Sequence, residues 1–189
     1  PQPAQSDEPC GAEPSTRAPT TERVSERTEG PESWLDAATA RDFDRARDLL
    51  GPGGVRAAAR SATTPRELWA LSDIARQSGH PREAIFPLER LVVDYGSHPQ
   101  APLAAFTLGR IQMDQLGAPT LAAENFERAI AMGLPGRLRE EAFFLRFLTH
   151  RRTNNHARAR GAAEAYLTRY PSGRHANVIL EALSEPRSE

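Results

Sequence analysis

The sequence has no lysine, one cysteine and few aromatic residues, which make up 6% of its 189 residues. All 24 basic residues are therefore arginine, and with the abundant alanine, proline and glycine this usage indicates a GC-rich bacterial genome. The single cysteine, Cys10, excludes an internal disulfide framework. No apolar run approaches the roughly 18–20 residues that a membrane-spanning helix needs. A net charge of -1 gives no strong field to attract nucleic acid or an anionic membrane.

Residues 1–32 differ in composition from the rest of the chain. They contain six prolines, many Ser, Thr and Glu, no aromatic residue, and Val24 as the only large aliphatic residue. Such a segment cannot bury enough apolar surface to offset the chain entropy lost on folding. We expect a disordered linker, with a net charge of −4 that leaves +3 on the remainder. Because the sequence begins at Pro1 rather than Met, we expect a processed or excised product.

From Ser33 onward the apolar residues follow a helical period, and short Gly-, Pro-, Asn- or His-containing breaks separate the segments. No segment alternates long enough for a strand. The expected helices are Trp34–Arg41, Phe43–Leu50, Val55–Ser61, Pro65–Gln77, Pro81–Asp94, Pro99–Gln115, Pro119–Met132, Gly136–Arg152, His156–Arg169 and Gly173–Leu183.

Residues at the ends of several segments support these helices. Thr64, Pro65 and Glu67 form a capping-box pattern with proline at the first helical position. Four glycines follow proposed helices, where a left-handed residue is expected: Gly79, Gly96, Gly117 and Gly133.

An internal repeat underlies the helical segments. Ala46, Ala84, Ala122 and Ala159 each lie early in a second helix and are spaced by 38, 38 and 37 residues. Two antiparallel helices need a small side chain where their axes come closest, and larger residues one and two turns later fill the space toward the next pair. A single pair cannot bury its own apolar face, so stacking is obligatory.

These segments resemble tetratricopeptide (TPR) repeats. One copy is carried by Leu108, Gly109, Ala122, Phe126, Ala129 and Pro135, another by Leu71, Ser72, Gly79, Ala84, Leu88 and Leu91, and the second half of a third by Ala159, Ala163, Tyr166 and Pro171. Arg146 and Phe147 depart from the family's Leu-Gly, which puts the packing of that helix in doubt.

The resemblance implies an all-α, right-handed α-solenoid of about three repeats. We expect an atypical N-terminal helical cap at 33–62, the repeats with a C-terminal capping helix at 63–184, and a disordered tail at 185–189. It also implies a non-catalytic protein–protein interaction module that binds a protein or peptide.

The repeats are longer than the commonest TPR length of 34 residues. Two linkers have the same pattern, which is an aromatic residue at a helix end, then a short turn, then alanine in the next helix. They are Tyr95–Ala101 and Tyr170–Ala176. This pattern resembles the repeats of bacterial envelope proteins: BamD, the TolA-binding protein and the C-terminal repeats of FecR-like regulators. It implies the partner-docking domain of a FecR-like transmembrane signalling protein in the cell envelope, in the periplasm, with the cytoplasm as the other location. The alternative is a scaffold for outer-membrane or Tol–Pal assembly.

No catalytic, cofactor-binding or metal-binding pattern is present. The five histidines are scattered without a metal-ligand spacing, and Cys10 lies in the predicted linker. Gly51–Gly54 follows a helix and lacks the Lys-Ser/Thr of a phosphate loop. We therefore expect no enzyme, cofactor or metal. A nucleic-acid or small-molecule binder is a third hypothesis, disfavoured because the charge is small and forms no basic stripe.

In the TPR architecture the first helices of successive repeats line one surface. The residues predicted there are Trp69, Asp73 and Arg76, then Phe106, Arg110 and Met113, then Phe144, Leu148, Arg151 and Arg152. An aromatic stripe flanked by arginine would suit a partner segment carrying acidic groups. If the helix phase differs by one residue, however, the aromatics pack between repeats and the arginines are ordinary solvated surface.

Overall fold

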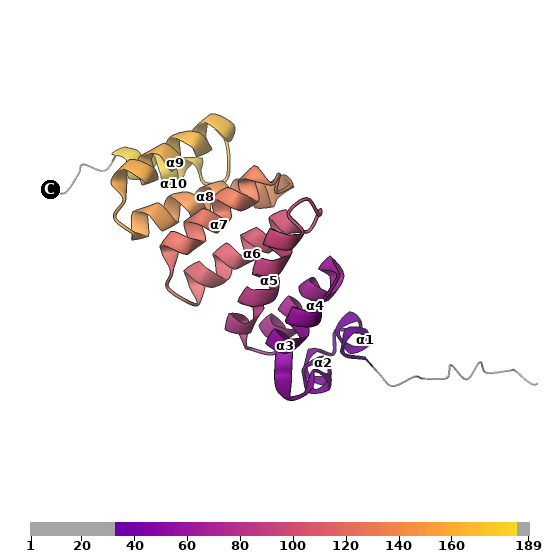
Figure 1. Cartoon of the computed structure of the whole chain (residues 1–189). Coiled ribbons are helices and arrows are strands. Elements are labelled where there is room, and N and C mark those ends of the chain that lie inside the picture. The colour runs from indigo at the N-terminus through magenta and orange to yellow at the C-terminus, as the bar shows by residue number, and fades with distance from the viewer. Residues whose placement is uncertain (1–32, 185–189) are drawn as a thin grey trace, which may run out of the picture. The chain divides into compact units, whose positions relative to one another are not determined.

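The computed structural model describes residues 33–184, so the predicted linker (1–32) and tail (185–189) lie outside the described residues. The described part is all-α, with ten α-helices, two short 3-10 helices and no strand (Figure 1). Its elements are α1 (Trp34–Thr39), α2 (Phe43–Leu49), η1 (Gly51–Gly53), α3 (Gly54–Ser61), α4 (Pro65–Gln77), η2 (Pro81–Ala84), α5 (Ile85–Asp94), α6 (Ala101–Asp114), α7 (Pro119–Ala131), α8 (Gly136–Arg152), α9 (His156–Arg169) and α10 (Ala176–Ser184).

Each expected helix is present, with small differences at the ends. The segment from Pro81 begins with the 3-10 turn η2 before α5, and the last helix begins at Ala176 rather than at Gly173. The capping box at Thr64 is confirmed: the Glu67 N–H donates to the Thr64 hydroxyl at 3.2 Å, and the Glu67 carboxylate accepts from the Thr64 N–H at 3.0 Å.

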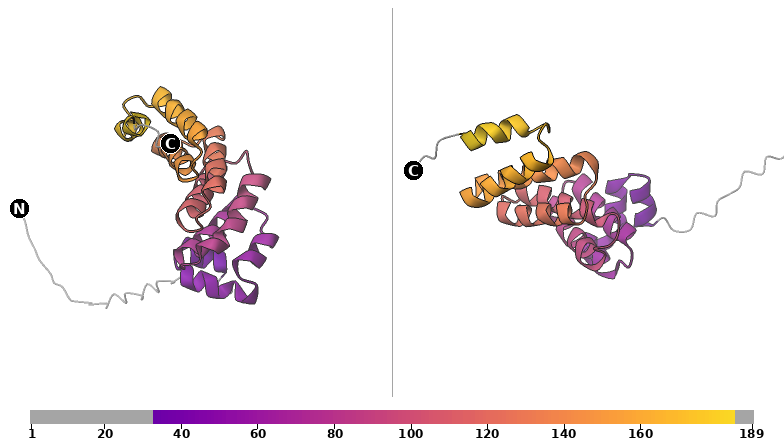
Figure 2. Two further views of the ribbon diagram at one scale, coloured as in Figure 1. Left: turned by 90° about the vertical axis from the view of Figure 1, so that its left-hand side faces the viewer. Right: turned by 90° about the horizontal axis from the view of Figure 1, so that it is seen from above.

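The helices pack as consecutive pairs. The first helix of a pair, here called an A helix, packs on the second, or B helix: α1 on α2, α4 on η2 and α5, α6 on α7, and α8 on α9. Between pairs, α5 packs on α6 and α7 on α8, so neighbours in sequence are neighbours in space (Figures 1 and 2). The additional helix α3 packs on α4 and α5, and α10 packs on α9.

The turn inside every pair has the same backbone feature. The four repeat alanines are buried, with exposed fractions of 0%, 0%, 0% and 5%. Five residues before each alanine stands a residue with positive φ: Arg41 (65°), Gly79 (80°), Gly117 (60°) and Asn154 (53°). Glycine adopts this conformation freely and asparagine tolerates it, whereas other L-residues lose roughly 1–2 kcal/mol. The repeat is thus set by a left-handed turn and a small residue at a fixed distance.

Gly96 does not have the left-handed conformation that the sequence predicted. Gly96 has no positive φ, and α5 ends at Asp94 with Tyr95 as its C-cap, whose N–H donates to the Leu91 carbonyl at 3.2 Å. A Cβ atom at Gly96 would lie 3.2 Å from the Val92 carbonyl oxygen, so close approach of the backbone favours glycine there.

The buried residues form two clusters that meet at α8. The first runs from Ala37 to Leu145, and the second from Phe147 to Ile179. The half-buried side chain of Leu148 packs against both. Helix α8 therefore faces a separate apolar cluster on either side.

The departure from Leu-Gly in α8 is explained by an exchange of large and small residues. In the preceding pair, a Cβ at Gly109 would lie 2.6 Å from the Phe126 ring, so glycine is needed where the two helices meet. In the α8–α9 pair the A helix carries Phe147, 2% exposed, and the B helix carries Ala163, 0% exposed, at the corresponding positions. The large side chain therefore lies on the B helix in the α6–α7 pair and on the A helix in the α8–α9 pair.

A hydrogen-bonded turn joins α9 to α10. The Tyr166 hydroxyl donates to Oε1 of Glu140 at 2.6 Å, and the Arg174 backbone N–H donates to the same oxygen at 2.7 Å. The His175 backbone N–H donates to the Tyr166 hydroxyl at 3.0 Å. A Cβ at Gly173 would lie 2.5 Å from that hydroxyl and 2.7 Å from Oε1 of Glu140, so this turn has space for glycine only.

We predict that Gly117→Ala lowers the free energy of unfolding by about 1 kcal/mol, because alanine is strained at φ 60° although its Cβ has open space. The matched control is Gly161→Ala in the exposed interior of α9, where the Cβ also meets nothing within 4 Å. It should raise stability by roughly 0.5–1 kcal/mol. Urea denaturation measures both, and a shift of the same sign in the two variants would contradict the left-handed turn.

We predict a pH-dependent loss of stability in Glu140→Gln. The Tyr166 hydrogen bond, then that of the Arg174 N–H, lowers the pKa of Glu140 below the ordinary 4.5. The ionised carboxylate thus stabilises the fold above about 4.5, and this contribution is lost as the pH falls through the lowered pKa. We expect Glu140→Gln to lose roughly 1.5–3 kcal/mol at neutral pH and much less at acidic pH. Urea denaturation of both proteins at neutral and acidic pH measures this loss. An equal difference in unfolding free energy at the two pH values would refute the prediction.

Candidate functional site

All ten residues predicted for the A-helix face lie on α4, α6 and α8, but their environments differ. Half-buried side chains are Trp69, Asp73, Arg76, Phe144 and Leu148; exposed ones are Arg110, Arg151 and Arg152; buried ones are Phe106 and Met113. The predicted stripe is therefore not one continuous exposed surface.

Phe106, in the middle of the predicted stripe, is a core residue. It is 6% exposed, and its ring centroid lies 5.8 Å from that of Phe126. Met113 is 9% exposed and belongs to the same cluster. These two buried side chains offer a partner almost no surface. For Phe106 this agrees with the alternative prediction, in which the aromatics are part of the packing rather than of an exposed stripe.

Phe144 is occupied by a neighbour within the chain. Its ring stacks on the His175 imidazole with centroids 3.8 Å apart and an angle of 2° between the planes. The predicted arginines also differ: Arg110 pairs with Asp114 at 2.9 Å, and Arg76 with Asp73 at 2.9 Å. Of the three predicted aromatics, Trp69 has a different environment, because it lines a pocket.

The pocket at Trp69, of about 240 Å³, lies on the N-terminal A helices and is here called the Trp69 pocket. Its lining comes from α1, α4, the turn and start of α2, and the residue before α6: Leu35, Ala38, Thr39, Arg41, Phe43, Arg66, Trp69, Ala70, Asp73 and Gln100. Residues far apart in sequence thus meet because α1 and α4 pack together.

The charged groups of the Trp69 pocket are two arginines and one carboxylate. Burial raises the pKa of Asp73, and Arg76, a hydrogen bond from the Trp69 side chain and Arg41 each oppose this rise. The guanidinium carbon of Arg41 lies 5.8 Å from the centre of the Phe43 ring. Arg66 donates from Nη2 to the Thr39 hydroxyl at 3.3 Å. The pocket therefore combines an aromatic wall with positive charge at its edge.

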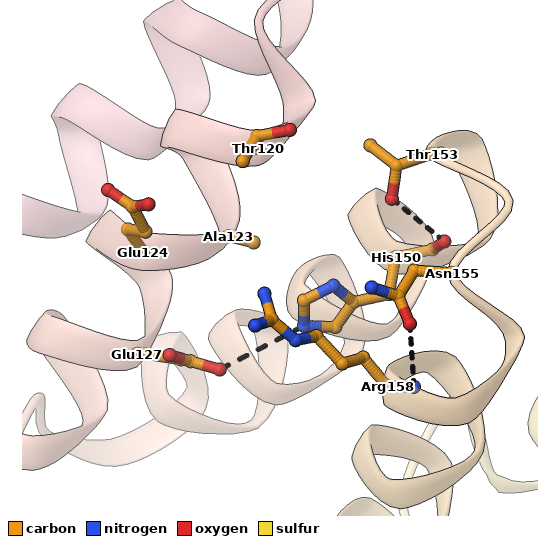
Figure 3. Close-up of a pocket in the computed structure, with 8 residues that line it drawn as sticks. All are labelled: Thr120, Ala123, Glu124, Glu127, His150, Thr153, Asn155 and Arg158. Carbon is orange, nitrogen blue, oxygen red and sulfur yellow. Dashed lines mark hydrogen bonds and ion pairs between the residues drawn. The ribbon is translucent and has the colours of Figure 1, made fainter.

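A second pocket, of about 120 Å³, lies between α7, the end of α8 and the start of α9 (Figure 3). Figure 3 shows Glu127 and His150 directed toward each other across α7 and α8, with Nε2 3.9 Å from Oε1. Burial lowers the pKa of His150, and Glu127 partly opposes this. Burial thus favours the neutral imidazole of His150, although the exposed Glu127 carboxylate lies beside it.

The described residues offer few groups for chemistry. Among them, no cluster of three or more His, Cys, Asp or Glu could hold a metal ion. Cys10 lies outside the described part. Within residues 33–184 no helix is long and apolar enough to cross a membrane. The lining of the Trp69 pocket contains a single carboxylate, that of Asp73.

The sequence predicted Trp69 and Asp73 for the A-helix face, but it did not predict the residues that line the pocket with them. Arg41, Phe43 and Arg66 reach the pocket through the contact of α1 with α4, which no local spacing reveals. One signal was available for Arg41, because it occupies the position that Gly79 and Gly117 hold in later repeats. The pairing of Glu127 with His150 has no such signal.

The described residues form a helical-repeat fold of TPR-like type. The chain is similar to the crystal structure of MamA, a TPR-like protein, with a TM-score of 0.53 and 22% sequence identity over 72% of this chain and 74% of that one. This likeness supports the fold expected from the sequence. No protein-family model matches the sequence, and a search of curated proteins finds no match.

We predict that Phe106→Ala lowers the free energy of unfolding by roughly 3–5 kcal/mol, because it leaves a cavity against Phe126 in the core. Trp69→Ala should lose only about 1–2 kcal/mol, since the indole is half-buried at a pocket. Urea denaturation compares the two. A larger loss at Trp69 than at Phe106 would contradict the assignment of Trp69 to the surface and Phe106 to the core.

Proposed function

We propose that this chain is a non-catalytic protein–protein interaction module that binds a protein or peptide through the Trp69 pocket. The observation that carries the proposal is the pocket itself: a half-buried indole in a recess of about 240 Å³ on the A-helix face, with Arg41 and Arg66 in its lining. Tryptophan and arginine are the residue types that most often dominate binding energy at protein interfaces.

The size and charge of the pocket favour a protein partner over the other classes. Small-molecule sites usually enclose about 300–1,000 Å³, and the Trp69 pocket is smaller. It suits a single large side chain presented by a longer segment. Residues 33–189 carry a net charge of only +3, which is weak support for nucleic-acid binding.

A finer proposal concerns the biological setting. We propose that the module is the partner-docking domain of a FecR-like transmembrane regulator, acting at the bacterial cell envelope on the periplasmic side. The two similar linkers support this. Tyr95 donates a hydrogen bond from its hydroxyl to the Thr63 carbonyl, and Tyr170 packs edge-on against Phe143 with centroids 5.7 Å apart. Each linker ends at a buried alanine that begins a helix, Ala101 or Ala176.

The second candidate is a structural scaffold for envelope assembly of the outer-membrane or Tol–Pal type. The same linkers support it, because the resemblance extends to proteins of that type. The two candidates differ in what they bind: a regulator docks one signalling partner, whereas an assembly scaffold holds several subunits of a complex.

We expect site-specific photocrosslinking to capture a protein at the pocket. A benzophenone amino acid replaces Gln100 in the pocket lining, and, as the matched control, Val93, which is 74% exposed on α5. In cells of the source organism the Gln100 probe should give a discrete adduct that Trp69→Ala abolishes. The Val93 probe should not give that adduct.

Fractionation of the adduct tests the setting. An adduct in the envelope fraction with one signalling protein supports the regulator, adducts with several assembly subunits support the scaffold, and a cytoplasmic adduct refutes both. The binding proposal fails if Gln100 yields no protein adduct, or the same adducts as Val93, while circular dichroism shows an intact fold.

A further inference from the structure

Arg41 has a left-handed backbone conformation that is unfavourable for arginine. The equivalent turns of the other pairs carry Gly79, Gly117 and Asn154, the residue types that adopt positive φ most readily. Arg41 has φ 65° and is exposed, so filling the buried core does not require a long side chain there. Backbone strain that the fold does not require is typical of functional positions.

The side chain of Arg41 lines the Trp69 pocket. Its guanidinium lies over the Phe43 ring at 5.8 Å, and among the described residues it has no hydrogen bond or ion pair. Asp73 pairs with Arg76 at 2.9 Å and attracts Arg41 through space, without a hydrogen bond to it. The N–H donors of the Arg41 guanidinium are therefore available to a bound molecule.

Arg66 provides a second such guanidinium in the same lining. Its one hydrogen bond within the described chain goes to a neutral group, the Thr39 hydroxyl at 3.3 Å. Two other arginines of the N-terminal pairs have carboxylate partners: Arg47 pairs with Glu83 at 2.9 Å and Arg90 with Asp94 at 2.8 Å. The pocket thus places two guanidinium groups without a hydrogen-bonded carboxylate partner next to Trp69, and Asp73 is the one carboxylate in the same lining.

We propose that Arg41 is retained in this conformation because its guanidinium, with that of Arg66, binds a carboxylate of a partner segment whose neighbouring apolar side chain packs on Trp69. This inference rests on the proposed function and adds the chemistry of the partner: an acidic peptide with an apolar anchor. Arginine binds carboxylates through charge-assisted, often bidentate hydrogen bonds. Asp73, in the same lining, disfavours a phosphate dianion more than a single carboxylate.

The experiment uses the full chain and two synthetic peptides, acetyl-Glu-Glu-Leu-Glu-Glu-amide and its Gln counterpart, acetyl-Gln-Gln-Leu-Gln-Gln-amide. Binding is followed by the NMR shift of the Trp69 indole N–H, assigned with Trp69→Phe, at low salt. We expect the acidic peptide to bind roughly tenfold more tightly than the Gln peptide, and this preference to shrink as salt is added.

A reciprocal pair of variants separates binding from folding. Arg41→Asn keeps a residue that tolerates positive φ and removes the charge, so it should raise the Tm and reduce binding of the acidic peptide roughly tenfold. Asn154→Arg places the strained residue in the equivalent turn before α9, so it should lower the Tm and leave peptide binding unchanged. Arg41→Lys, which keeps the charge, should retain part of the preference.

Four results would overturn the inference: equal binding of the two peptides, no shift of the Trp69 indole with either, unchanged acidic-peptide binding in Arg41→Asn, or a lower Tm in Arg41→Asn, which would give Arg41 a structural role. Failure of the proposed function is distinguishable, because the Gln100 photocrosslink depends on neither peptide. A Trp69-dependent protein adduct together with equal binding of both peptides would leave the binding module in place and remove only the role of Arg41.

Discussion

The close approach of the two helices within each pair is the constraint on which the fold depends. A left-handed residue reverses the chain, and five positions later a buried alanine lets the second helix lie against the first. With aromatic residues at only 6%, the chain has little bulk to fill a wide gap between helices. Tight pairs built on alanine bury backbone and small side chains efficiently, and each pair then covers the apolar face of the next.

The same constraint is met in different ways along the array. In the α6–α7 pair the A helix carries the small residue, Gly109, and the B helix carries Phe126. In the α8–α9 pair the A helix carries the large residue, Phe147, and the B helix carries Ala163. The sum of the two side chains matters more than which helix carries the larger one, as expected when cores are specified by volume and pattern. A motif search that requires Leu-Gly on the A helix therefore finds the α6–α7 pair more readily than the α8–α9 pair.

Much of the fold was predictable because its signals are local. Helical periodicity, the Thr64 capping box and the alanine spacing all act within a few turns, and the helices follow them closely. The surface was less predictable because exposure depends on helix rotation and on non-local neighbours. A rotation of one residue separates a groove position from a core position, and Phe106 lies on the core side. Arg41 and Phe43 line the Trp69 pocket because α1 and α2 pack near α4. The residue spacing within α4 does not predict this contact.

The division of the core at α8 has a consequence for how the molecule would respond to change. Because the N-terminal cluster holds the helices around the Trp69 pocket and the second cluster begins only at Phe147, the two ends are connected mainly through one helix and Leu148. In repeat proteins, coupling passes chiefly between adjacent units. Substitutions, truncations or fusions placed beyond α8 should therefore leave the Trp69 pocket unchanged, which makes the C-terminal pair the natural place to attach a reporter or to graft extra repeats.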